Sequence, residues 1–137
     1  MRLDLYQAET ARVAAEQGAL LAQAKAIIKQ GRALTALEQG GVLHALQILI
    51  ENAIGKAKQL LKASGQPVPV SGYDTFKALV SYGLVAQVDL PTWNAIVGLR
   101  NRIVHDYMNI DMDQVLALIA NDRDQFVVRF LVTEFPQ

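Results

Sequence analysis

The sequence contains no cysteine, and this absence excludes several chemistries at once. Disulfides, cysteine-based zinc sites, iron–sulfur clusters and cysteine nucleophiles are all ruled out. The absence agrees with a reducing cytoplasm, where we expect the protein to reside. Histidine is scarce too: only His44 and His105 are present, and together with the scattered acidic residues they show no recognised metal-ligand spacing. We therefore expect no metal and no other cofactor.

The chain also lacks a surplus of either charge and any long apolar run. Its 13 Lys and Arg residues balance 13 Asp and Glu residues, which argues against a general nucleic-acid coat but leaves room for a local basic patch. The most apolar stretch, residues 41–54, is interrupted by four polar residues, so we expect no membrane span. No apolar segment follows the first residues, so we expect no signal peptide.

Hydrophobic residues make up 52% of the 137 residues, and the mean hydropathy of +0.19 is high for so small a soluble protein. The length suits a single domain, which we take to span residues 1–137. Because the hydropathy is high, we expect part of the apolar surface to be buried against another chain.

The spacing of apolar residues predicts an all-α bundle of four to five helices, led by two long ones. Residues 3–30 are rich in helix formers, and Gly31 is the expected C-cap. A second long helix is predicted to begin within 35–41 and to end near Ser64, before two prolines. A short helix follows over 75–82. The predicted buried stripe of the first helix comprises Leu3, Tyr6, Thr10, Val13, Gln17, Leu20, Ala24 and Ile27.

Two further helices are predicted in the C-terminal half. One begins near Asp89, carries Pro91 in its first turn and ends near residues 105–107. The last helix is capped by Asp111 or Asp113. Its expected apolar face comprises Val115, Leu118, Ile119, Phe126 and Phe130.

Residues able to bind phosphate or transfer protons are concentrated at positions 100–107, which read Arg-Asn-Arg-Ile-Val-His-Asp-Tyr. On an ideal helix Asn101 and His105, four residues apart, share one face, and Arg100 and Tyr107 share another edge. Arg100 and His105 lie about 140° apart around the helix axis. Either a long arginine bridges that gap near a frayed helix end, or the two groups meet across a two-fold axis, each facing the partner's copy.

Each of these residues also has a purely structural interpretation. Arg102 and Asp106 would form an i,i+4 ion pair worth a few tenths of a kcal/mol. His105 would be favoured at a helix C-terminus by the macrodipole, and Tyr107 would be an aromatic at the core edge. Composition alone favours these interpretations, because short Arg/His combinations arise by chance.

The spacing Arg, four residues, His, one residue, Tyr resembles the signature of HEPN domains, specifically the HepT-like toxins of HEPN/MNT (type VII) toxin–antitoxin pairs. It follows an apolar helix and precedes Met108-Asn109-Ile110-Asp111. Chain length and helix order are similar over most of the chain. The resemblance implies an HEPN-type bundle and a metal-independent endoribonuclease, in which a 2′-hydroxyl attacks the adjacent phosphate.

The resemblance also implies roles for individual residues. His105 would transfer protons near neutral pH, and Arg100 would bind phosphate oxygens. Asn101 would orient His105 or a phosphate oxygen, and Arg102 would support the site. Tyr107 would accept AMP groups from an MNT nucleotidyltransferase antitoxin, which would place charge and bulk where RNA must bind. The implied assembly is a homodimer whose two motif helices form one cleft.

Two alternatives remain open at this level. A non-catalytic HEPN module would use the same residues to bind nucleotide, or would serve as the partner subunit of a nucleotidyltransferase. A plain helical interaction protein would carry the motif by accident. The RNA target, whether tRNA or mRNA, is not specified by the sequence.

Residues outside the motif receive simpler predictions. His44 is expected to be a partly buried structural histidine, and Glu51 to need a partner, for which an arginine of the motif helix is a candidate. Three aromatic residues are expected in the core, namely Tyr73, Phe76 and Trp93. Three lysines are expected to form a solvated face or to help hold an RNA backbone, namely Lys56, Lys58 and Lys62.

Overall fold

The computed structural model describes residues 3–134, which are entirely helical apart from turns and loops. Its α-helices are α1 (Leu3–Lys29), α2 (Ala36–Ala63), α3 (Gly72–Ser81), α4 (Leu90–His105), α5 (Met112–Ala120) and α6 (Asp124–Val132). Short 3-10 helices lie at Gln87–Asp89 (η1) and Tyr107–Asn109 (η2). The predicted all-α fold with two long leading helices is confirmed. Over the described range no helix is long and apolar enough to cross a membrane.

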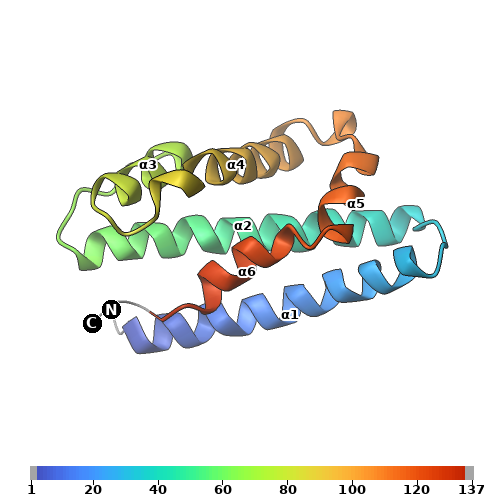
Figure 1. Cartoon of the computed structure of the whole chain (residues 1–137), viewed down its shortest axis with the longest axis horizontal. Coiled ribbons are helices and arrows are strands. Elements are labelled where there is room, and N and C mark those ends of the chain that lie inside the picture. Colours follow the sequence, from blue (N-terminus) through green and yellow to red (C-terminus); the bar gives the residue numbers. More distant parts are fainter. Residues whose placement is uncertain (1–2, 135–137) are drawn as a thin grey trace.

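Helix α2 is the centre of the bundle (Figure 1). It packs against α1 along one side, against α3 and α4 on the other, and against α6, which also contacts α1. The turn between α1 and α2 uses Gly31 at a φ of +79°, as expected for a glycine C-cap. A capping box of Thr35 and Glu38 then starts α2. Helix α4 runs antiparallel to α2, so the motif residues lie beside the N-terminal half of α2.

An aromatic cluster fixes α3, α4 and α6 to one another. The rings of Phe76 and Trp93 stack with centroids 4.1 Å apart, and Phe126 and Phe130 each lie 4.8 Å from Trp93. The core positions predicted for Phe76 and Trp93 are confirmed. The prediction for Tyr73 is wrong, because its side chain is 41% exposed; its hydroxyl lies 3.3 Å from the position that a Cβ of Gly98 would occupy.

The buried stripe of α1 agrees with the prediction only in part. Its buried residues are Thr10, Ala14, Leu21 and Ala24, whereas Leu20 is 47% exposed. Thr10 and Ala24 are therefore confirmed, whereas Ala14 and Leu21 are buried where their neighbours Val13 and Leu20 were predicted.

The predicted last helix is in fact two helices, α5 and α6. The helical path is interrupted at Asp122, which adopts a φ of +59°. Lys25 of α1 stabilises this break by pairing with Asp122 at 3.1 Å and with Asp124 at 2.9 Å. Of the two expected caps, Asp111 is the one used, since its carboxylate accepts from the Gln114 amide. Asp89 does occupy the N-cap position of α4, but its side chain accepts no capping hydrogen bond.

Lys56 is buried, contrary to the predicted solvated lysine face. Its side chain is 2% exposed, and its Nζ donates to the carbonyl oxygens of Phe130 at 2.7 Å, Leu131 at 3.3 Å and Thr133. These carbonyls lie at the end of α6, where the helix leaves acceptors unpaired. Burial lowers the pKa of Lys56 to about 8.

Candidate functional site

The rotation of α4 is set by its buried residues. Trp93, Val97, Leu99 and Ile103 face the core, which leaves Arg100 and Asn101 half-buried at one edge of the helix. Arg102 and His105 are exposed. The sequence motif is therefore presented along one edge and the outer face of a helix that the core holds rigidly.

Arg100 is held in place by α2. Its Nε and Nη2 donate to one carboxylate oxygen of Glu51, at 3.1 and 2.8 Å, and its Nη1 donates to Asn101 Oδ1 at 3.2 Å. Gln47 donates to the same Glu51 oxygen at 3.4 Å. The predicted pairing of Glu51 with an arginine of the motif helix is confirmed. Arginine has five N–H donors, so two remain for a ligand.

A groove of about 440 Å³ opens beside Arg100. Its wall on α4 consists of Val97, Arg100 and Asn101, and Glu51 and Lys58 contribute from α2. The N-terminus of α3 closes the third side, where Gly72 packs tightly against Ile54 of α2 and Val97 of α4. The remaining lining residues are Ile54, Gly55, Val70, Ser71, Gly72 and Tyr73. Two predicted site residues thus face one open groove.

His105 is the last residue of α4 and does not line this groove. It shares a helix face with Asn101, as predicted from their spacing. Within residues 3–134 no hydrogen bond or ion pair engages its ring. Arg100 points at α2 while His105 is exposed, so a single chain does not bring the two groups together.

Tyr107 lies beyond the end of α4, in η2, so the predicted shared helix edge with Arg100 does not exist. Asp106, with φ −144° and ψ 40°, redirects the chain. The Tyr107 ring instead leans on the start of α2: its hydroxyl is 3.9 Å from the position that a Cβ of Gly40 would occupy. The side chain is 50% exposed and thus accessible.

His44 is exposed, and its predicted partial burial is wrong. It is the only exposed residue of α2 between positions 42 and 61, all of which are described. Gly40, His44, Gln47 and Glu51 follow one another at steps of four, three and four residues, so they share a face. That face meets Tyr107 at one end and Arg100 at the other. The sequence interpretation treated His44 as structural, although its spacing of seven residues to Glu51 places both on one helix face.

The structural alternative for Arg102 is not formed. Asp106 accepts a hydrogen bond from Asn109 at 2.7 Å, and no ion pair with Arg102 occurs in the described chain. No group of three or more His, Cys, Asp or Glu residues able to hold a metal occurs between positions 3 and 134.

Comparison with known proteins identifies the same family by two routes, a family model and a sequence relative. A family model described as "Ribonuclease HepT-like" matches residues 20–130. The mRNA nuclease HepT of Shewanella oneidensis is 30% identical over 88 residues, which are 64% of this chain and 66% of that protein, slightly under two thirds of its length.

Two solved structures share the fold. One is a toxin–antitoxin crystal structure with AMP-PNP, with a TM-score of 0.77 and 21% identity over 92% of this chain and 97% of that one. The other is a tri-AMPylated Shewanella oneidensis HEPN toxin in complex with MNT antitoxin, with a TM-score of 0.73 and 24% identity over 89% and 93%.

Proposed function

This chain belongs to the ribonuclease HepT-like family, and we propose that it is a metal-independent endoribonuclease, the toxin of an HEPN/MNT toxin–antitoxin pair. Its substrate is RNA, and its antitoxin is an MNT nucleotidyltransferase. Family membership alone does not assign the chemistry, which depends on the residues at the end of α4.

RNA carries its own nucleophile. When the 2′-hydroxyl attacks the adjacent phosphorus, the bond to the 5′-oxygen breaks and leaves a 2′,3′-cyclic phosphate and a 5′-hydroxyl. The protein must accept one proton, donate another and stabilise the added negative charge on phosphorus. His105 transfers protons, and Arg100 donates to the phosphate oxygens. Asn101 orients the reacting groups, and Arg102 supports the RNA backbone.

The observation that carries this proposal is the state of Arg100. Glu51 and Asn101 hold its guanidinium at the rim of an open groove, and two N–H donors stay free. A guanidinium positioned before the substrate arrives stabilises transition-state charge without reorganising. A purely structural Arg100 would need no opening beside it.

A two-chain site follows from the different directions of Arg100 and His105. One chain supplies one motif histidine, whereas cleavage requires both an acid and a base. Two copies related by a two-fold axis place each His105 near the partner's motif and supply both proton-transfer groups. Exposed apolar residues near the motif, Val104 and Met108, are available to such an interface.

End-group analysis of cleaved RNA tests the chemistry. We expect 2′,3′-cyclic phosphate and 5′-hydroxyl ends in the presence of EDTA, and a loss of about 100- to 10,000-fold in rate for His105→Ala. Arg100→Ala should lose about 100- to 1,000-fold. Wild-type protein that binds RNA without cutting it would favour the non-catalytic alternative. A His105→Ala variant as active as wild type would contradict the assignment.

Mixing wild-type and His105→Ala chains tests the shared site. After random exchange at equal amounts, about one quarter of the dimers are fully wild type. Activity should then fall to about one quarter if both histidines are needed, against about one half if the chains act independently. An activity proportional to the wild-type fraction would exclude the composite cleft.

Tyr107 is the proposed AMP acceptor. Its half-exposed hydroxyl is accessible to a transferase, and an attached AMP would place a negative charge beside the phosphate-binding groups. Labelled ATP and the cognate nucleotidyltransferase should modify the wild-type chain but not Tyr107→Phe, which should keep ribonuclease activity. Equal labelling of the two proteins would place the modification elsewhere.

A further inference from the structure

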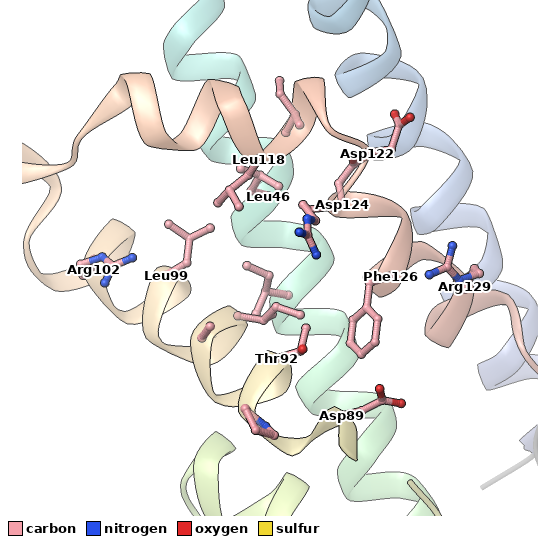
Figure 2. A pocket seen from close by; sticks show the side chains of 16 residues that line it. Leu46, Asp89, Thr92, Leu99, Arg102, Leu118, Asp122, Asp124, Phe126 and Arg129 are labelled. Atoms are coloured by element: carbon pink, nitrogen blue, oxygen red, sulfur yellow. The ribbon is translucent and has the colours of Figure 1, made fainter. Parts of the chain in front are cut away.

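A second and larger groove, of about 700 Å³, follows the other side of α4 (Figure 2). It lies between α4 on one side and the α5–α6 pair on the other, above α2. Along α4 it extends from Pro91 to Arg102, about 16 Å at 1.5 Å per residue. Its floor is apolar and is formed by Leu46, Ile50, Ile96, Leu99, Leu118 and Phe126.

The groove is lined by all the arginines that have no ion-pair partner within residues 3–134. Residues 3–134 contain six arginines, and three of them pair with carboxylates: Arg12 with Glu9 and Glu16, Arg32 with Glu38, and Arg100 with Glu51. The other three are Arg102, Arg123 and Arg129. All three are exposed, have no ion-pair partner in the described chain and line this groove.

The acidic residues of the groove offset this charge only in part. Asp122 and Asp124 share the single positive charge of Lys25, at 3.1 and 2.9 Å, and the Asp124 carboxylate is fully buried. With Asp89 included, the three arginines and Lys25 against three carboxylates leave a net charge of +1. Asp89 lies at the N-terminus of α4, at the end of the groove opposite Arg102. In Figure 2, Arg102 and Arg129 lie on opposite sides, with Leu99, Leu118 and Phe126 between them. The groove therefore combines a cationic rim with an apolar floor.

The groove begins beside the motif. Arg102 and His105 are three residues apart on α4, so they are neighbours on the helix surface. A strand whose phosphate lies at His105 can thus continue past Arg102 into the groove. The span of about 16 Å suits an extended chain carrying several phosphates better than one small anion.

We propose that this groove binds the segment of single-stranded RNA that flanks the cleaved phosphate, with backbone phosphates on Arg102, Arg123 and Arg129 and bases over the apolar floor. The proposal rests on the proposed function in taking RNA as the ligand. The faces of the bases are flat and apolar, which suits the floor of the groove, and the phosphates of the backbone are negatively charged, which suits the arginines of the rim. An acidic protein segment matches the rim alone.

Binding of a non-cleavable RNA tests the groove without depending on catalysis. The probe is a fluorescein-labelled, mixed-sequence single-stranded RNA with 2′-O-methyl groups, which removes the attacking hydroxyl. The test variant is Arg123→Ala/Arg129→Ala in the full-length protein. The matched control is Arg12→Ala/Arg32→Ala, which removes the same charge from two exposed arginines outside the groove.

The salt dependence of affinity gives the expected magnitude. Each phosphate contact to a single strand contributes about 0.7 to the slope of log affinity against log salt, so losing two contacts flattens the slope by about 1.4. If the variant and wild type bind equally at 1 M salt, this difference in slope makes the affinity of the variant at 0.15 M salt about tenfold weaker than that of wild type. The control should keep the wild-type slope. Circular dichroism and molar mass should be unchanged in both variants.

Different failures have different signatures. If wild-type protein binds and cuts RNA while both double variants bind the probe alike, the groove assignment is wrong and the proposed function stands. If wild-type protein neither binds nor cuts RNA, the proposed function fails. If Arg123→Ala/Arg129→Ala loses only the antitoxin, or changes its oligomeric state, the groove is a protein interface and the inference is overturned.

Discussion

The role of Glu51 allows a sharp prediction, because this residue is argued to act only through Arg100. Its carboxylate receives two N–H donors of Arg100 on one oxygen, at 3.1 and 2.8 Å. Glu51→Gln keeps the size of the side chain and removes the charge. Arg100 is then attracted less strongly to α2 and samples orientations away from the groove. We expect kcat for RNA cleavage to fall about 10- to 100-fold, since displacing a catalytic group by about 1 Å costs on this order.

The effect of Glu51→Gln on stability should be small. The side chains of Arg100 and Glu51 are 27% and 33% exposed, so solvent already screens the pair. Exposed ion pairs contribute about 0.2–1 kcal/mol and hydrogen bonds to charged groups about 1.5–3 kcal/mol. An intermediate site should lose about 1 kcal/mol of unfolding free energy, or about 4 °C in Tm. The catalytic loss is therefore larger than the loss of folded protein.

The assay compares kcat, KM and urea denaturation at one protein concentration, because the stability of the proposed dimer would depend on protein concentration. Glu9→Gln is the matched control: it breaks an exposed pair with Arg12 on α1, far from the motif in the chain, and should leave kcat unchanged. The reasoning is refuted if Glu51→Gln cleaves RNA with the wild-type kcat. It is also refuted if activity falls only in proportion to unfolded protein.

Three further predictions concern stability. Gly72→Ala should destabilise the fold by about 1–3 kcal/mol in urea denaturation, because a Cβ there lies 3.1 Å from Ile54 and from Val97. Gly18→Ala, in the middle of α1 with nothing within 4 Å, should instead stabilise the fold by about 0.5–1 kcal/mol, and equal signs for the two would contradict the packing argument. Lys56 has a folded pKa of about 8 against an ordinary 10.5, so the unfolded chain binds more protons between these values. The unfolding free energy of wild type should therefore rise from pH 8 to 10 relative to Lys56→Met, and parallel profiles would refute the lowered pKa.

Local signals predicted most of the fold. Helix formers, the apolar period, Gly31 and the two prolines after Ser64 each act within a few residues, so the sequence alone placed α1, α2 and α4 well. The Arg100–Glu51 pair was also predictable, since a carboxylate among apolar residues needs a partner. The family resemblance carried by residues 100–107 is confirmed by the match over residues 20–130.

The errors came from interactions between distant parts of the chain. The break between α5 and α6 is stabilised by Lys25, about 100 residues earlier in the chain. Lys56 is buried because its Nζ donates to carbonyl oxygens at the end of α6, which lie 74 to 77 residues later in the chain. Neither partner is visible in a local window. The burial of His44 was predicted wrongly because α2 as a whole is apolar, whereas the exposure of one residue depends on the helix face on which it lies.

Net charge is a poor guide to where the proposed RNA substrate would bind, and pairing explains why. The chain is formally neutral, yet its acids are not spread evenly over its cations. Arg12 and Arg32 are paired with Glu9 and Glu38, whereas within residues 3–134 Arg102, Arg123 and Arg129 have no ion-pair partner and line one groove. At physiological salt the Debye length is about 8 Å, so a phosphate responds to the charges beside it and not to the total. A neutral protein can therefore attract RNA strongly to one helix and weakly elsewhere, and sequence specificity then depends on the bases that the apolar floor accepts.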